Sequence, residues 1–180
     1  QKMSIGSVAL HGDMEQQARS QTLIRFANGS ANVLVATDVA ARGLDIDDVD
    51  AVFNFELPHQ VESYVHRIGR TGRSGRDGTA MSLVSDREMS RLKAIETDLN
   101  RGAMRLWRAD SDTQEEHRRP HVTLIAPRVH TLEINGGRKQ KLRPGDILGA
   151  LTAGGELGAD VVGKIDILPM VSYVAVAKEQ

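Results

Sequence analysis

The sequence of 180 residues predicts an α/β fold with a parallel sheet covered by helices, followed by a small α+β domain. Two observations lead to this prediction. In residues 1–107, helix patterns alternate with short apolar runs, which is typical of a helix-covered parallel sheet. After a polar stretch at 108–121, residues 122–180 show alternating strands and one short helix. We therefore predict two domains joined by a linker.

The elements of the first domain follow in order. A helix is predicted from an N-cap at Asp13 to about Ala27, closed by Asn28 and Gly29. A second helix is predicted from near Glu62 into Gly69. Three apolar runs are predicted strands, of which the first should be covered on both faces: 33–36, 51–55 and 79–84.

A capping box opens the last helix of this domain. Ser85 and Glu88 have the spacing at which the side chain of each residue can accept a hydrogen bond from the backbone N–H of the other. The apolar residues that follow recur at helical spacing and predict one buried face: Met89, Leu92, Ile95 and Leu99. In the second domain we expect strands at 131–134, 164–168 and 172–176, a turn at 135–137 and a helix at 144–151.

Composition excludes several classes of protein. Cysteine is absent, which removes disulfides and thiolate metal sites and fits a reducing compartment. The formal net charge is −1, so a nucleic-acid site has to be local. No apolar run approaches the roughly 20 residues of a membrane span, and no signal peptide opens the chain. We expect a cytoplasmic protein that does not bind a membrane.

The most informative segment is 66–73, with the sequence HRIGRTGR. Arg67 and Arg70 are three residues apart and share a face of a helix, while glycines favour a helix end that releases Arg73 into a loop. Forked guanidiniums aimed at one point can bind a polyanion such as the terminal phosphates of a nucleotide. The alternative is a solvated basic helix end.

A second segment, 36–46, follows the predicted strand at 33–36 directly. It combines small residues, a hydroxyl at Thr37, carboxylates at Asp38 and Asp45, and an arginine at Arg42. Ligands in open α/β sheets bind beyond the carboxyl ends of the strands. Taken alone, the segment is equally compatible with a tight loop capped by an aspartate.

Together these motifs resemble the second RecA-like domain of DEAD-box RNA helicases. The resemblance covers about residues 8–100, with the motifs in the same order and at the same intervals. It rests on the segments HGD at 11–13, Gln16 with Arg19, 37–45, VFNF at 52–55 and 66–73.

The resemblance implies roles for individual residues. It implies that Arg70 and Arg73 are arginine fingers that meet the ATP γ-phosphate, with the accompanying Mg²⁺ held by a first domain. The remaining implied roles are ribose contact by Asp45 with Gly43 beside it, RNA backbone contact by Gln16, Arg19 and Thr37, and linkage to the partner domain by His66 and Arg67.

The second domain resembles the appended RNA-binding domain of DbpA-type bacterial helicases, with a looser likeness to DeaD-type cold-shock helicases. The resemblance is carried by 135–151, 163–165 and 173–176, and it implies an RRM-like fold that recognises a hairpin in large-subunit ribosomal RNA. The residues expected to bind RNA are Arg138, Lys139, Lys141, Arg143 and Lys164. The Gly136–Gly137 turn is expected to be flexible, and with Tyr173 as the only ring, recognition should depend little on base stacking.

Two other patterns do not support a site. Residues 158–165 resemble a P-loop, but Ile165 lacks a hydroxyl for Mg²⁺ and a strand is expected to follow. His117 and His121 have a metal-like interval, but Pro120 breaks the helix that would align them. We interpret both histidines as parts of the linker.

No Walker lysine and no Asp-Glu-Ala-Asp run is present. We therefore expect a fragment, in which the first domain lacks its start and the second its end, and which does not hydrolyse ATP alone. The complete protein is expected to be an ATP-dependent RNA helicase that acts on structured RNA in ribosome assembly. The alternatives are a non-catalytic RNA-binding protein that uses the first domain as a scaffold, a DeaD-type enzyme, or a DNA helicase.

Overall fold

The fold is taken from a computed structural model. It describes residues 5–41, 46, 49–73, 75–100, 104–106, 126–155 and 157–178. The chain divides into two compact units, one of residues 1–42 with 122–180 and one of residues 43–121. This division differs from the predicted boundaries. The predicted boundaries stay a prediction, and the linker at 108–121 and its two histidines lie outside the described residues.

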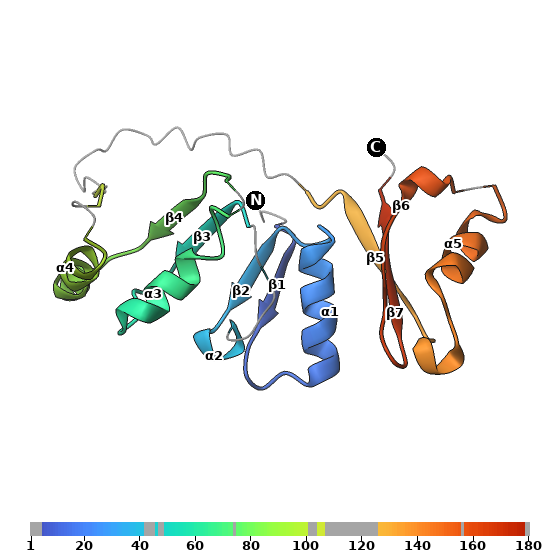
Figure 1. Cartoon of the computed structure of the whole chain (residues 1–180), viewed down its shortest axis with the longest axis horizontal. Helices are drawn as coiled ribbons and strands as arrows, with labels where there is room; N and C mark the ends of the chain where they lie inside the picture. Colours follow the sequence, from blue (N-terminus) through green and yellow to red (C-terminus); the bar gives the residue numbers. More distant parts are fainter. Residues whose placement is uncertain are drawn as a thin grey trace. The chain divides into compact units, whose positions relative to one another are not determined.

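The first unit begins with a β-α-β arrangement in which a helix connects two parallel strands (Figure 1). Its elements are β1 (Ser7–Leu10), α1 (Gln16–Ala27), β2 (Val33–Ala36) and α2 (Asp38–Ala41). The helix does not start at an Asp13 cap, as predicted. Instead, Asp13 lies in a turn with its carboxylate 3.6 Å from His11 Nδ1, and Glu15 occupies the N-cap position.

The strand β2 was predicted to be covered on both faces, and this prediction was wrong for the described structure. Val33 is 41% exposed and Val35 is 61% exposed. The reason is that β2 pairs with β1 alone in the described residues, so one edge and much of its surface face solvent. The apolar run correctly predicted the strand but not its surroundings.

The second unit contains a further pair of parallel strands and two helices. Its elements are β3 (Ala51–Asn54), α3 (Val61–Ile68), β4 (Thr79–Ser82), the 3-10 turn η1 (Asp86–Glu88) and α4 (Met89–Asp98). A compact core joins the two helices through Leu57, Tyr64, Leu92 and Ile95, with Met89 and Leu99 packed against them. The predicted apolar face of α4 is therefore confirmed. The Ser85–Glu88 capping box is also confirmed, since Ser85 N donates to Glu88 Oε2 at 3.0 Å.

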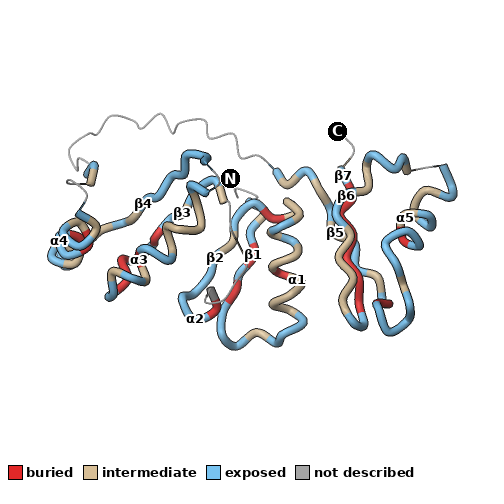
Figure 2. The backbone as a smooth tube through the Cα atoms, in the orientation of Figure 1, coloured by how far each residue is buried: buried red, intermediate tan, exposed pale blue. Residues whose placement is uncertain are grey.

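The C-terminal part of the first unit is an antiparallel sheet with a helix on one face (Figure 1). Its elements are β5 (Val129–Ile134), η2 (Arg138–Gln140), α5 (Pro144–Thr152), η3 (Ala159–Val161), β6 (Val162–Ile167) and β7 (Ser172–Ala177). The central strand is β7, which is buried along almost its whole length (Figure 2). Ile147 of α5 packs on Val174 and Val176.

The order β-α-β-β with a central third strand agrees with the predicted RRM-like fold. The 3-10 turn η3 and the start of β6 make up the P-loop-like segment 158–165, and β6 continues to Ile167, so no helix follows that segment. None of the helices that the structure describes is long and apolar enough to cross a membrane.

Candidate nucleotide and RNA sites

The loop after α3 carries Arg70 and Arg73 and is fixed at its base. The backbone N–H of Val49 donates to the Arg70 carbonyl at 3.0 Å. The Thr71 hydroxyl donates to the Val49 carbonyl and, at 3.1 Å, to the Asp50 carbonyl. Because Val49 and Asp50 immediately precede β3, the loop is held at the start of a strand rather than free in solvent.

The Arg70 side chain joins two of the predicted nucleotide-binding segments. Its Nε donates to the His66 carbonyl at 3.3 Å, and its Nη1 donates to the Ile46 carbonyl at 3.5 Å. Ile46 follows the predicted ribose-binding residues Gly43 and Asp45, which lie outside the described residues. A guanidinium has five N–H donors in a fixed planar fork, so these two contacts orient the Arg70 side chain.

Arg73 is exposed and turns back toward the same helix end. Its Nε donates to the Gly69 carbonyl at 2.6 Å, so Arg70 and Arg73 each bind a carbonyl of the last turn of α3 or of its C-cap. These carbonyls carry the negative end of the helix dipole and attract cations. Gly72 has a φ of +67°, a conformation that side chains rarely adopt, and it makes this reversal possible.

The two residues with a predicted interdomain role differ in their surroundings. His66 is exposed on α3. Arg67 is half-buried, and its Nη1 donates to Asn54 Oδ1 at 3.0 Å and to the Glu56 carbonyl at 2.9 Å. The guanidinium of Arg67 thus makes contacts within its own unit, and linkage of either residue to another domain remains a prediction.

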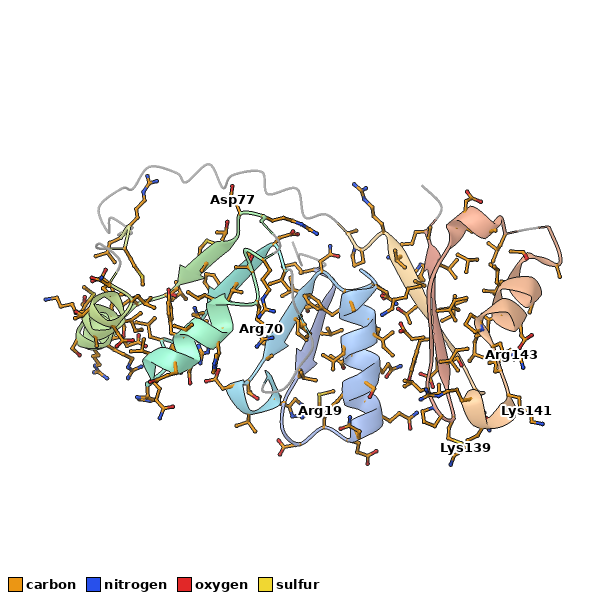
Figure 3. All side chains as sticks on the ribbon, in the orientation of Figure 1. Arg19, Arg70, Asp77, Lys139, Lys141 and Arg143 are labelled. Carbon is orange, nitrogen blue, oxygen red and sulfur yellow. The ribbon has the colours of Figure 1, made fainter. Side chains whose placement is uncertain are left out.

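The predicted RNA-backbone residues of the first unit gather at the carboxyl ends of β1 and β2. Gln16 is exposed at the first position of α1, and Arg19 Nη2 donates to the Ala40 carbonyl at 3.3 Å. Thr37 follows β2 directly, is exposed, and is fixed by its backbone N–H to the Leu10 carbonyl at 3.2 Å. Parallel strands present ligand-binding loops at this end. Figure 3 shows Arg19 at the amino-terminal end of α1.

Four cations lie on the connection between β5 and α5, and all four are exposed. We call this segment, residues 138–143, the basic turn. It contains Arg138, Lys139, Lys141 and Arg143. No ion pair involves any of the four within the part of the chain that the structure describes. Figure 3 shows the three labelled side chains projecting outward from this connection. The turn therefore offers concentrated positive charge to a phosphate backbone.

The Gly136–Gly137 turn was expected to be flexible, and the structure shows close packing at the second of its two glycines. A Cβ on Gly137 would stand 2.2 Å from the Leu168 carbonyl oxygen, so the backbone is packed tightly there. The N–H groups of Arg138 and Lys139 donate to the carbonyls of Leu168 and Pro169, each at 3.0 Å. Close backbone packing against the β6–β7 connection thus gives the basic turn one defined shape.

Lys164 lies apart from the basic turn. Its Nζ is 3.1 Å from Asp166 Oδ1 on the same strand, β6. Leu168, which contacts the basic turn, is four residues further along the chain, or about 13 Å in extended backbone. The structure therefore does not join Lys164 to the four clustered cations, and its role in RNA binding remains a prediction.

Tyr173, the aromatic residue of β7, is only 1% exposed. Burial raises the pKa of its hydroxyl, and the neighbouring Glu133 carboxylate raises it further. A ring buried in this way cannot serve as a stacking platform for a base. The expectation that stacking contributes little is consistent with this burial.

No group of three or more His, Asp or Glu side chains that could hold a metal occurs in the described residues. The predicted nucleotide-binding residues that the structure describes are the two arginines at the end of α3, and their contact with a nucleotide stays a prediction.

Sequence reasoning missed several residues that shape these sites. Asn54 is buried in β3 and binds Arg67, while Thr71 anchors the arginine loop. A Cβ on Gly78 would stand 2.3 Å from the Gly72 nitrogen, so Gly78 closes the same loop. One signal was available for Asn54, because asparagine is depleted from strands and its presence in an apolar run indicates a specific role. No local pattern distinguished Thr71 or Gly78.

Two family models match the chain. One describes the helicase conserved C-terminal domain and matches residues 1–75, and the other describes the DbpA RNA binding domain and matches residues 131–180. Both matches fall on the segments that carry the candidate sites.

Curated relatives agree with these matches. The ATP-dependent RNA helicase DbpA of Escherichia coli is 47% identical over 172 residues, which cover 94% of this chain and 35% of that protein. DbpA of Bacillus subtilis is 35% identical, and the match covers 93% of this chain and 38% of that protein. The DEAD-box ATP-dependent RNA helicase CshA of Bacillus cereus is 49% identical over 69% of this chain and 23% of its own length. The chain thus spans little more than a third of the DbpA relatives.

Two solved structures resemble the helicase part. A DEAD box protein from Methanococcus jannaschii has a TM-score of 0.51 at 41% identity, covering 54% of this chain and 27% of its own. The C-terminal domain of the DEAD-box protein Dbp5 has a TM-score of 0.51 at 38% identity, and the match covers 56% of this chain and 59% of that domain's chain. Fold and matches together define the RecA-like C-terminal part of a helicase, joined to an RNA-binding domain. The chain belongs to the DEAD-box helicase family, as a C-terminal region of its DbpA type.

Proposed function

We propose that the complete protein hydrolyses ATP when RNA binds and uses the cycle to remodel structured RNA. In this proposal ATP and RNA draw two RecA-like domains together, and this chain contributes Arg70 and Arg73 to phosphates held by the other domain. ATP would arrive with Mg²⁺, whose ligands would come from that domain. Hydrolysis would then let the two domains separate.

The observation that carries the proposal is the construction of the arginine loop. Arg70 and Arg73 both bind carbonyls at the end of α3, and hydrogen bonds to Val49 and Asp50 fix the loop between them. Guanidiniums that are already oriented stabilise charge on a transferred phosphoryl group without reorganising during the reaction. An arginine supplied in this way is worth about 10³–10⁵ in rate in phosphoryl-transfer enzymes.

The test is RNA-stimulated ATP turnover of the complete protein with Arg70→Ala. We expect turnover to fall by about 10³-fold or more, with RNA affinity retained, because the basic turn is untouched. Arg87→Ala is the matched control, since Arg87 is an exposed arginine in η1. Unchanged turnover in Arg70→Ala refutes the finger role. Absence of ATPase activity in the unaltered protein supports a non-catalytic RNA-binding protein instead.

For the C-terminal part, we propose that the basic turn binds a hairpin of large-subunit ribosomal RNA and delivers the helicase to nearby duplexes in the cytoplasm. The match of residues 131–180 to the DbpA RNA binding domain and the four exposed cations of the basic turn support this. Titration of the protein with ribosomal RNA hairpins and with unstructured RNA of equal length tests it. Equal affinities would contradict hairpin recognition, and equal stimulation of ATPase by RNA and DNA would contradict an RNA-specific enzyme.

A further inference from the structure

Asn54, the last residue of β3, is a polar side chain at a position where a strand favours apolar ones. It is 2% exposed, although asparagine is depleted from strands. A buried amide costs free energy unless its oxygen and its nitrogen both find hydrogen-bond partners. The partners of Asn54 therefore indicate its role.

The Asn54 amide connects two strands and a helix. Its Nδ2 donates to Ser82 Oγ on β4 at 3.2 Å, and its Oδ1 accepts a hydrogen bond from Arg67 Nη1 on α3 at 3.0 Å. Asn54 and Ser82 are also direct neighbours in the parallel register of the two strands. Because a guanidinium can only donate, Arg67 determines that the oxygen of the amide faces α3 and the nitrogen faces Ser82.

Arg67 holds the chain on one side of Arg70, and Thr71 holds it on the other. Arg67 lies three residues before Arg70, whose backbone N–H donates to the Arg67 carbonyl at 3.2 Å. Thr71 follows Arg70 directly and is bound to carbonyls at the start of β3. A displacement of about 1 Å at a reacting group can cost about 10²-fold in rate, so such anchors matter for catalysis.

We propose that Asn54 is a positioning residue, which holds Arg67 against the sheet and thereby keeps Arg70 in place for the phosphates of ATP. This inference rests on the proposed role of Arg70 as an arginine finger. Asn54 does not reach the nucleotide itself, since its side chain is buried and both ends of its amide are hydrogen-bonded within the unit.

The test compares two substitutions in the complete protein. Asn54→Leu keeps a similar volume and removes both hydrogen bonds. Asn54→Asp keeps one oxygen for Arg67 and a second that can accept from the Ser82 hydroxyl. We expect kcat for RNA-stimulated ATP turnover to fall by about 10²-fold in Asn54→Leu and to recover most of that loss in Asn54→Asp. Ser90→Ala, at an exposed position of α4, is the control.

A double-mutant cycle separates positioning from a general structural role. If Asn54 acts through Arg67, then Asn54→Ala lowers kcat when it is the single substitution. In a protein that already carries Arg67→Ala, the same substitution lowers kcat little further. Additive losses in kcat, or an Asn54→Asp variant as slow as Asn54→Leu, would overturn the proposal. Should Asn54→Leu fail to fold, Ser82→Ala replaces it. This variant removes the hydrogen bond between Asn54 and Ser82 without changing the residue at position 67.

Hydrogen exchange distinguishes failure of this inference from failure of the proposed function. We expect the amides of residues 66–73 to exchange faster in Asn54→Leu than in the unaltered protein, while those of α4 do not change. This outcome supports the tether even if the complete protein proves to have no ATPase activity, in which case the proposed function fails alone. Unchanged exchange in this segment overturns the inference, as does faster exchange with unchanged kcat in an active enzyme.

Discussion

Gly72 and Gly78 lie against each other so closely that a Cβ added to Gly78 would stand 2.3 Å from the Gly72 backbone nitrogen. The same Cβ would stand 2.6 Å from Thr71 Oγ1. These backbone contacts close the loop that starts at α3 and ends at β4. Any side chain at Gly78 would therefore push on the segment that carries the two arginines.

Gly78→Ala should displace the arginine loop. We expect the free energy of unfolding to fall by about 1–3 kcal/mol, as for other substitutions that overpack a close contact, and ATP turnover of the complete protein to fall with it. Thermal unfolding and RNA-stimulated ATPase assays measure the two effects. Gly149→Ala is the matched control, because a Cβ at that helical position would meet no atom within 4 Å apart from its chain neighbours and the backbone of its own helix. Equal stability of the two variants would contradict the close packing.

Thr71→Val removes the hydroxyl that binds the carbonyls of Val49 and Asp50 while keeping the shape of the side chain. We expect the free energy of unfolding to fall by about 1 kcal/mol, the usual net contribution of such a hydrogen bond. Expressed as activation free energy, the loss of kcat should be larger than this, because the loop beside Arg70 is released. Thr71→Ser keeps the hydroxyl and should restore both. Steady-state kinetics at saturating RNA would show whether kcat, rather than the KM for ATP, is affected.

Gly137→Ala should distort the basic turn, whereas Gly136→Ala should be tolerated. A Cβ on Gly137 would stand 2.2 Å from the Leu168 carbonyl oxygen, but on Gly136 the nearest atom would be 3.7 Å away, an ordinary contact. We expect weaker RNA binding for Gly137→Ala alone, by about tenfold or more, since overpacking of about 1–3 kcal/mol falls on the turn that presents the cations. Fluorescence anisotropy with labelled RNA measures this difference.

Neutralising the basic turn should lower the salt dependence of RNA binding. The slope of log K against log salt is negative. For Lys139→Ala or Arg143→Ala, we expect its magnitude to fall by roughly 0.7–0.9 for each RNA phosphate that the altered side chain no longer binds. Lys164→Ala should change the slope less, because Asp166 lies 3.1 Å from its ammonium. Lys93→Ala, at an exposed position of α4, is the control. Identical slopes for all four proteins would make the basic turn merely solvated surface.

Glu88 makes stability depend on acid pH. Hydrogen bonds from the Ser85 side chain and backbone, and from the Leu57 backbone, lower its pKa below the ordinary 4.5, and Arg91 lowers it further. The carboxylate thus stabilises the fold above pH 4.5, and this contribution is lost as the pH falls through 4.5 toward the lower value in the folded protein. Glu88→Gln should unfold with a flatter pH dependence in thermal melts below about pH 5. Parallel pH profiles would contradict this assignment.

The sequence determined the kind and order of most elements, because these follow from patterns among near neighbours. The strand β1, directly before His11, and the short helix α2 were not predicted. The capping box at Ser85 and the apolar face of α4 appeared where they were predicted, as did the strands and helices within a few residues. The spacing of glycine and arginine in 66–73 was likewise sufficient to identify the arginine loop. Local propensity and periodicity carry this information, since both depend only on residues close together in the chain.

Only the tertiary structure decided which residues hold that loop and how the basic turn is shaped. Asn54 and Arg67 are 13 residues apart, Thr71 and Val49 are 22 apart, and Gly137 meets Leu168 across a helix and a strand. The exposure of β2 also depended on which strands lie beside it. Contacts between segments far apart in the chain are set by packing and backbone geometry, and these leave no periodic signal in the residues that make them.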